Sequence, residues 1–335
     1  MRAFLIVSVF LVGLISPATA QDVESFYRGK QVRIIVGFSS GGGYDQYGRL
    51  LARHISRRIP GVPTVVVQNM PGAASLKSLQ YLDAGAAPDG TTIATFNPGL
   101  ILGSLTAPHK TPIDFRNFSW IGNISEDVRV CFTWSARGMG DWTSFLARGA
   151  VVFGNTGAGT SAYLDDRMLL MLFGVKLKMV QGYPGSADKK IAIESGELDG
   201  DCGSWTSLPQ DWLREKKIDI HVRFSKSIPV DMPQDIPWAP DFLDSETSKQ
   251  TFRLLVSGAE IGRPFLTSKS VPVDRVDALR AAFDATMKDP EFLADAEKQH
   301  LLIGPDDGAT VAKRIFDIYA ASPEVIARAR EIAGD

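Results

Sequence analysis

Residues 33–49, RIIVGFSSGGGYDQYGR, decide the fold because a strand pattern gives way to a helix pattern within them. Residues 32–36 are a short apolar run rich in β-branched side chains, which predicts a buried strand. Four glycines fall within residues 37–43. From Tyr44 onward, apolar side chains recur at helical spacing, so the stretch predicts a strand, a glycine turn and a helix.

Such a unit favours the binding of an anion. The first turn of a helix carries unpaired N–H groups and the positive end of the helix dipole, and glycines let a ligand approach the backbone closely. A second unit follows, in which residues 150–153 predict a strand and residues 154–166, GNTGAGTSAYLDD, lead into another helix. Two units predict two α/β lobes. If they face each other across a cleft, they would bind a small molecule with negative charge or polar acceptors at both ends.

The first twenty residues, MRAFLIVSVFLVGLISPATA, predict a secretory signal peptide with cleavage after Ala20. Its apolar run, residues 3–15, is shorter than the ~20 residues that a membrane span requires. We therefore expect an exported mature chain located in the periplasm.

Alternating strand and helix patterns between residues 31 and 96 predict a parallel sheet. The C-terminal part is helical by its period, and a helical tail that packs on the first lobe would make that lobe discontinuous. The expected fold is α/β with two lobes, each a mostly parallel sheet flanked by helices, and a ligand cleft between them. The expected boundaries are residues 21–124 plus 255–335 for lobe 1 and residues 125–254 for lobe 2.

Charge and cysteine content argue against two classes of function, nucleic-acid binding and zinc binding. The formal net charge is −2 and no long basic run occurs, which argues against nucleic-acid binding. The two cysteines, Cys131 and Cys202, fit no zinc pattern; in an exported protein they either pair or pack as two buried thiols. We expect no metal and no cofactor.

Two short motifs suggest other functions. Residues 37–41, GFSSG, match the G-x-S-x-G turn of serine hydrolases, so an exported hydrolase with Ser39 as nucleophile is the alternative function. The turn follows the first strand of the mature chain, however, and none of the four histidines has a distinguishing context. Residues 157–162, GAGTSA, match a dinucleotide fingerprint but lack the acidic residue expected after the next strand.

Several carboxylates have structural interpretations. Asp45 and Arg49 stand four residues apart on one helix, which predicts an ion pair at the surface or rim. Asp199 and Asp201 share one face of a strand and are expected to accept hydrogen bonds from loop N–H groups. Trp205 either lines a pocket or packs, and Ser186 is expected to cap a helix.

The chain resembles a known family over nearly all of its mature length. The resemblance rests on linked motifs in both halves: residues 27–55, YRGKQVRIIVGFSSGGGYDQYGRLLARHI; 65–82, VVVQNMPGAASLKSLQYL; 87–96, APDGTTIATF; 154–165, GNTGAGTSAYLD; 181–205, QGYPGSADKKIAIESGELDGDCGSW; and 262–298, GRPFLTSKSVPVDRVDALRAAFDATMKDPEFLADAEK. These motifs are similar to those of the extracytoplasmic substrate-binding proteins of tripartite tricarboxylate transporters, the Bug-type receptors.

The resemblance implies a two-lobed periplasmic binding protein of type II-like fold. It would close on a small carboxylate and deliver it to integral-membrane transporter subunits, as a monomer and without catalytic chemistry. It implies ligand contacts at Phe38, Ser39, Ser40, Gly41, Gly42, Gly43, Tyr44, Asp45, Gly72, Ala73, Thr156, Gly157, Ala158, Gly159, Thr160 and Ser161, and at Gly203 and Ser204. Many relatives carry Ser or Thr where this chain has Tyr44.

Lysine and arginine are scarce in both glycine loops. We therefore expect main-chain N–H groups and helix dipoles to hold most of the anion's charge.

Overall fold

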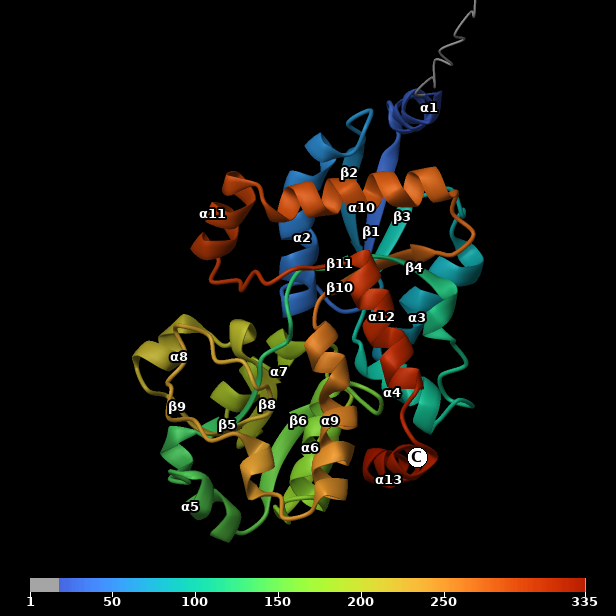
Figure 1. Ribbon diagram of the computed structural model, residues 1–335. Helices are drawn as coiled ribbons and strands as arrows, with labels where there is room; N and C mark the ends of the chain where they lie inside the picture. Colours follow the sequence, from blue (N-terminus) through green and yellow to red (C-terminus); the bar gives the residue numbers. More distant parts are fainter. Residues whose placement is uncertain (1–17, 335) are drawn as a thin grey trace, which may run out of the picture.

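The computed structural model describes residues 18–334, with side chains from Val23. Of the predicted signal peptide, residues 1–17 lie outside the described part, and residues 18–20 begin the first helix. None of the described helices combines the length and apolar character needed to cross a bilayer. The described chain forms two lobes, each built on its own sheet, with one lobe above the other in Figure 1.

The first sheet has the strand order β11-β4-β10-β3-β1-β2. Its strands are β1 (Gln31–Val36), β2 (Thr64–Asn69), β3 (Thr92–Thr95), β4 (Phe118–Asn123), β10 (Pro264–Ser268) and β11 (Asp306–Asp307). We call the part of the molecule around this sheet lobe 1.

The second sheet has the order β7-β6-β8-β5-β9 and forms lobe 2. Its strands are β5 (Arg129–Trp134), β6 (Val151–Asn155), β7 (Leu177–Gln181), β8 (Gly200–Ser204) and β9 (Ile218–Arg223).

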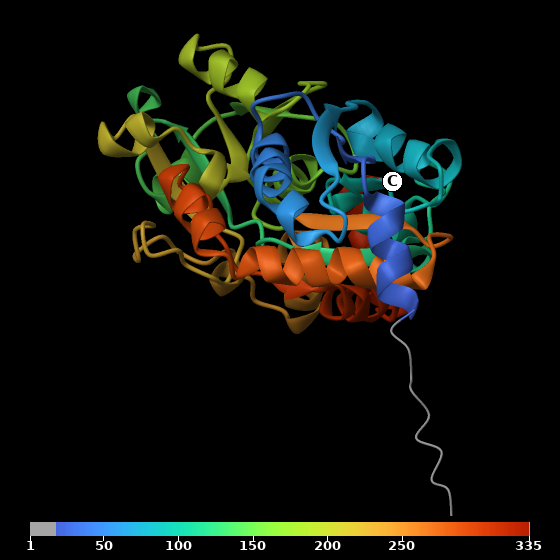
Figure 2. The same ribbon diagram turned by 90° about the horizontal axis from the view of Figure 1, so that it is seen from above.

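The helices flank both sheets (Figures 1 and 2). In chain order they are α1 (Ala18–Tyr27), α2 (Gly43–Ile55), α3 (Leu76–Gln80), α4 (Gly99–Thr106), α5 (Trp142–Ala147), α6 (Ser161–Met171), α7 (Ser186–Glu194), α8 (Gln210–Arg214), α9 (Glu246–Ile261), α10 (Val273–Met287), α11 (Pro290–Lys298), α12 (Gly308–Tyr319) and α13 (Pro323–Ala333).

The expected sheets form, with most strands of each sheet running in one direction, but both sheets are mixed. β1 pairs in parallel with β2 and β3, but β10 runs antiparallel to β3 and β4. In lobe 2, β5 runs antiparallel to β8 and β9. The reason is topological: β5 and β10 are the strands by which the chain enters each sheet from the other lobe, so they run against their neighbours.

The side chains of strand β1 point alternately to the two faces of the sheet. Val32, Ile34 and Val36 pack in the core under α1, α2 and α10, whereas Ile35 faces a second core on the opposite side of the sheet. All four side chains are buried, as the apolar run predicts for a strand covered on both faces.

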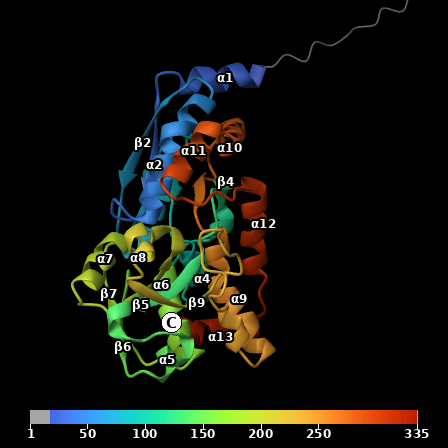
Figure 3. The ribbon, with the colours of Figure 1, turned by 90° about the vertical axis from the view of Figure 1, so that its left-hand side faces the viewer.

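The second core continues from one lobe into the other. It joins Phe96 and Leu100 of lobe 1 to Met168 of lobe 2 through Leu255 of α9 and Ile332 of α13. Figure 3 shows α9, α12 and α13 along one side of the molecule, and α13 contacts both α4 and α6. The C-terminal helix therefore spans both lobes, whereas α10, α11 and α12 lie on lobe 1.

Side-chain-to-backbone hydrogen bonds fix α13 at both lobes. Arg167 of α6 donates from Nε to Ile332 O at 2.7 Å, and Arg330 donates from Nε to Thr106 O at 2.8 Å.

The two cysteines, for which the sequence left two states open, form a disulfide in the structure. Cys131 of β5 lies directly opposite Cys202 of β8 in the antiparallel register, with 4.1 Å between the Cα atoms. The bond joins the two central strands of lobe 2 beneath the cleft.

His221 makes the stability of lobe 2 depend on pH. Its ring is fully buried, stacks on Phe145 with 4.3 Å between centroids, and lies 2.8 Å from Thr133 Oγ1 through Nε2. Burial lowers its pKa to about 4, from 6.5. A histidine that is harder to protonate in the folded state stabilises the fold above pH 6.5 and loses that contribution as the pH falls from 6.5 toward 4.

We therefore expect acidification from pH 8 to pH 5 to remove about 2 kcal/mol of unfolding free energy through His221. Urea unfolding at both pH values measures this loss. His221→Gln should lose about 2 kcal/mol less than the wild type over the same interval, and the exposed His109→Gln should behave as the wild type does. Equal losses in all three proteins would contradict this assignment.

Candidate functional site

Across the cleft, the first glycine loop meets the turn that precedes α7. Gly42 immediately precedes α2 and Gly185 immediately precedes α7. A Cβ atom on Gly42 would lie 3.2 Å from Ser186 Oγ, and one on Gly185 would lie 2.6 Å from Ser39 Oγ. The N-termini of α2 and α7 thus converge from different lobes. Ser186 is the first residue of α7, and Gly185 occupies the capping position that the sequence assigned to Ser186.

A cavity of about 70 Å³ lies between the lobes at this point, which we call the inner cavity. It is lined by Phe38, Gly42, Gly43, Tyr44, Asn97, Asp127, Arg129, Thr156, Ala162, Gly185, Ser186, Lys189, Cys202, Gly203, Ser204, Ser207 and Arg263. Seven of these, Phe38, Gly42, Gly43, Tyr44, Thr156, Gly203 and Ser204, are among the predicted ligand contacts.

A second space of about 440 Å³, which we call the outer groove, shares Phe38 and Thr156 with the inner cavity. It is lined by uncharged residues: Gly37, Phe38, Pro71, Gly72, Ala73, Ala74, Ser75, Thr156, Gly157, Ala158, Gly182, Tyr183 and Pro184. The predicted contacts Gly72, Ala73, Gly157 and Ala158 belong to this groove, and the role of all these residues in ligand binding stays a prediction.

The predicted ion pair between Asp45 and Arg49 forms, but the predicted position at the surface or rim is wrong for Asp45, which is 2% exposed. Its carboxylate accepts hydrogen bonds from Gly41 N, Arg49 Nε and Asn69 Nδ2, each at 2.9 Å. Although burial opposes ionisation, these donors hold its pKa below the usual range. Asp45 therefore fixes the first glycine loop and lines neither space. Ser40 and Gly41 are exposed at the outside of the same loop.

The remaining predicted contacts of the second loop support its shape. Thr160 caps α6 by accepting from Tyr163 N, and its hydroxyl donates to Gly157 O at 2.8 Å. Ser161 donates to Asn97 Oδ1 at 3.1 Å and so ties α6 to lobe 1. Gly159 lies close to Gly99 of the facing lobe.

The structure also brings charged residues into the site that the glycine loops do not contain. The chain passes between the lobes in two crossing segments, residues 124–128 and 261–263, which lie side by side. Asp127 N donates to Ala259 O at 2.7 Å, and Arg263 N donates to Ser125 O at 2.9 Å. Asp127 and Arg263 extend from these segments into the inner cavity.

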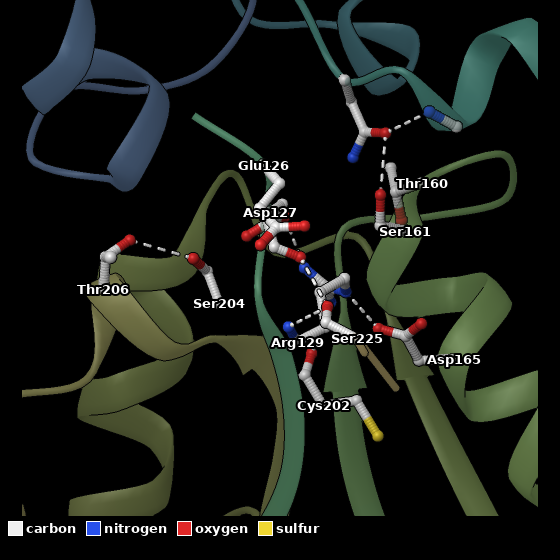
Figure 4. Close-up of polar contacts among 12 residues, drawn as sticks. Glu126, Asp127, Arg129, Thr160, Ser161, Asp165, Cys202, Ser204, Thr206 and Ser225 are labelled. Carbon is white, nitrogen blue, oxygen red and sulfur yellow. Dashed lines mark hydrogen bonds and ion pairs between the residues drawn. The ribbon is translucent and has the colours of Figure 1, made fainter. Parts of the chain in front are cut away.

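Arg129 has a protein acceptor on each of its side-chain nitrogens. It donates from Nη1 to Asp127 Oδ2 at 3.0 Å, from Nη2 to Cys202 O at 3.0 Å, and from Nε to Asp165 (Figure 4). Each of its three nitrogens therefore has a partner.

Arg263 is held by one nitrogen only. Its Nη2 atom donates to Asp127 Oδ1 and to Ser204 Oγ, both at 2.9 Å. The guanidinium carbon lies 4.4 Å from the ring centroid of Tyr44, which itself stacks on Phe38. This position places a fixed cation against an aromatic wall of the inner cavity.

The buried acids of the network differ in their protonation. Burial would raise the pKa of Asp127, but Arg263 and Arg129 outweigh it and hold that pKa below its usual value. Burial raises the pKa of Asp165 to about 6 despite the adjacent Arg129. Burial also raises the pKa of Asp166 well above its usual value.

Lys189, on α7, is the third buried cation, and its Nζ lies 2.6 Å from Asp201 Oδ1. Burial raises the pKa of Asp201 in spite of this lysine. Asp199 accepts from Val152 N at 2.8 Å, so it has a structural role, but its donor belongs to strand β6 and not to a loop as expected. Trp205 is buried, donates to Asp231 and lines a separate hollow of lobe 2, so it packs there and also lines a pocket, but not the inner cavity.

The glycine loops contain few cations, yet the inner cavity contains three. Arg129, Lys189 and Arg263 reach it from other segments of the chain, so the composition of the loops could not predict them. In the sequence, each looks like an ordinary surface residue. The sequence signal for Arg263 is its place in the family motif of residues 262–298.

A serine hydrolase needs a histidine beside its nucleophile, which would be Ser39 here. Its hydroxyl faces Gly185, as described above. Two of the histidines are engaged elsewhere: His54 Nε2 lies 2.9 Å from Asp295 Oδ2, and His221 is buried in lobe 2. Within residues 18–334, no group of three or more His, Cys, Asp or Glu side chains is arranged to hold a metal ion.

No family model matches the chain. A curated relative from Cupriavidus necator, described as a UPF0065 protein in the gbd 5′ region, is 27% identical over 205 residues. The match covers 59% of this chain, which thus spans 60% of the length of that relative.

Solved structures match over more of the chain. The periplasmic binding protein BugD superposes with a TM-score of 0.73 at 20% identity, over 92% of this chain and 99% of BugD. MatC from Rhodopseudomonas palustris, solved with bound malate, gives 0.72 at 18% identity, over 91% and 99%. A TctC solute-binding protein from Polaromonas gives 0.63 at 18% identity, over 92% and 99%. The chain thus has the two-lobed α/β fold of the periplasmic binding proteins, and it resembles the Bug-type receptors of tripartite tricarboxylate transporters in both sequence and structure.

Proposed function

We propose that the chain is a periplasmic solute receptor that binds a small carboxylate between its lobes and delivers it to a membrane transporter of the tripartite tricarboxylate type. The observation that carries the proposal is the inner cavity, where the N-termini of α2 and α7 converge beside Arg263. Helix N-termini and a guanidinium both favour a carboxylate. MatC, which shares the fold, was solved with malate.

The proposed division assigns residues 21–124 and 255–335 to lobe 1 and residues 125–254 to lobe 2, with signal-peptide cleavage after Ala20. Ligand entry then requires the lobes to separate at the glycine loops. We propose the two crossing segments as the hinge. The core shared by α9 and α13 joins the two lobes on the side away from the glycine loops and would stay packed during the motion. Small-angle scattering should show a smaller radius of gyration with saturating ligand, and an unchanged radius would count against closure.

A thermal-shift screen against small carboxylates tests the function itself. A ligand at ~100 times its dissociation constant stabilises a folded protein by about 2.7 kcal/mol, which raises the unfolding temperature by several degrees. We expect such a shift with at least one carboxylate. The absence of a shift across C2–C8 mono-, di- and tricarboxylates would contradict the proposal.

Substitutions in the glycine loops test whether the backbone of these loops holds the ligand. Gly157 has φ +112°, which a β-branched residue adopts only under strain, and a Val at Gly42 would press on Ser186. We expect Gly42→Val and Gly157→Val each to weaken ligand binding at least about tenfold. Arg49→Ala removes a half-exposed partner of Asp45 and should change the affinity less than either.

Titration calorimetry on folded variants, with a ligand from the screen, makes the comparison. If Arg49→Ala abolishes binding while both glycine variants bind normally, the backbone N–H groups of the loops are not what holds the ligand.

A hydrolase remains the alternative function because of the G-x-S-x-G turn. It predicts that purified protein cleaves short-chain esters and that Ser39→Ala abolishes the cleavage. The receptor proposal predicts no turnover by either protein, together with ligand binding by both.

A further inference from the structure

We propose that Arg263 and Tyr44 bind the ligand carboxylate directly, so that a guanidinium at the hinge, and not the loop backbone alone, selects acids over uncharged analogues. The inference rests on the proposed function and assigns particular residues to it. Both residues line the inner cavity, and they come from segments far apart in the chain.

The first argument is the incomplete hydrogen bonding of Arg263. The residue is 2% exposed, and its Nε and Nη1 atoms are buried without a hydrogen-bond partner among the described residues. A buried donor left unpaired costs about 1–3 kcal/mol, and more when the group is charged, so an orphaned guanidinium needs an explanation. An acceptor supplied by the ligand would pair with these nitrogens.

The second argument comes from Tyr44. Its hydroxyl is also buried and has no hydrogen-bond partner within the described chain. Burial raises the pKa of Tyr44, so the hydroxyl stays protonated and can donate at neutral pH. Arg263 and Tyr44 lie beside each other and thus present three polar groups without a well-formed hydrogen bond in the same small cavity.

The third argument is a comparison with the other cations of the cavity. Arg129 uses all three nitrogens on protein acceptors, and Lys189 is paired with Asp201. Arg263 is the cation of the three that has buried nitrogen atoms without an acceptor in the described chain, and Asp127 and Ser204 fix it through Nη2. A guanidinium held on one side and free on the others is suited to a carboxylate.

The position of Arg263 connects carboxylate binding with the proposed closure of the two lobes. Arg263 belongs to one crossing segment and its partner Asp127 to the other, and Ser204 ends β8 of lobe 2. A carboxylate bound to Arg263 therefore contacts the point where both segments meet. Tyr44 and the start of α2 add the contribution of lobe 1.

The experiment measures binding of malate, succinate and adipate, and of succinamide and adipamide as uncharged analogues, by titration calorimetry. We expect the wild type to bind at least one acid and neither amide. Arg263→Gln should weaken binding of that acid about 10- to 150-fold, the range of one or more charge-assisted hydrogen bonds. Tyr44→Phe should weaken it about 2- to 10-fold.

Arg53→Ala is the matched control. Arg53 is a half-exposed arginine on the same helix as Tyr44 that pairs with Asp295 outside the cavity, and its removal should leave the affinity within twofold. Unfolding temperatures without ligand report whether each variant folds. If Arg263→Gln does not fold, Arg263→Lys replaces it. Lysine keeps the charge beside Asp127 but lacks the planar donors, so the affinities of Arg263→Lys and Tyr44→Phe then test the inference.

The outcomes separate the inference from the function. If the Arg263 and Tyr44 variants bind the acid within twofold of the wild type, or if the wild type binds the amides equally well, the inference is wrong while the receptor function stands. If the wild type binds none of the three acids, the inference falls too, and the carboxylate screen decides whether the receptor function survives.

Discussion

Replacing Asp127 with Asn should lower the free energy of unfolding by about 3–5 kcal/mol, the loss typical of breaking a buried ion pair on one side. Asp127 is 3% exposed and accepts from both Arg129 and Arg263. Asn keeps the size of the side chain but removes the charge that lies between two buried cations. Arg129 retains Asp165, whereas Arg263 retains only Ser204.

Urea denaturation of the ligand-free proteins measures this effect. Asp114→Asn is the control, because Asp114 also pairs with an arginine, Arg116, but with both side chains partly exposed. A surface pair of this kind contributes at most about 1 kcal/mol. Equal losses for Asp127→Asn and Asp114→Asn would show that the network at the crossing segments does not stabilise the fold.

Removing the disulfide should have an effect of similar size. Cys131 and Cys202 are 71 residues apart in sequence, and closing a loop of that length removes chain entropy from the unfolded state equivalent to about 4 kcal/mol. The Cys131→Ala, Cys202→Ala double variant should therefore unfold roughly 10 °C below the oxidised wild type.

Wild type treated with a reductant provides the matched comparison, since it keeps both sulfur atoms. It should unfold close to the double variant and well below the oxidised protein. Oxidised and reduced wild type that unfold at the same temperature would contradict the stabilising role of the bond.

The sequence predicted the local elements well, because each carries its own signal. The apolar run at residues 32–36 and the glycines after it became β1 and the turn into α2. Strand β10 was missed because Pro264–Ser268 is short and begins with a proline, which commonly marks a loop.

The charged part of the site could not be predicted, because its cause is tertiary. Asp127, Arg129 and Arg263 become buried only when the two crossing segments lie side by side. Asp45 shows the same limitation: helical spacing placed it on the polar face, but that face is covered by the loop whose N–H group it accepts from. A periodicity describes one element and contains no information about its neighbours.

The place of β10 within the first sheet determines the order in which the protein can assemble. β10 lies between β3 and β4, so one edge of each of these strands stays unpaired until residues 264–268 become available. All strands of lobe 2 precede that point in the chain, since β9 ends at Arg223. If the chain emerges from its N-terminus into the compartment where it folds, the inserted lobe can therefore finish its sheet first. Meanwhile the N-terminal half of the other sheet exposes strand edges that can pair with other chains.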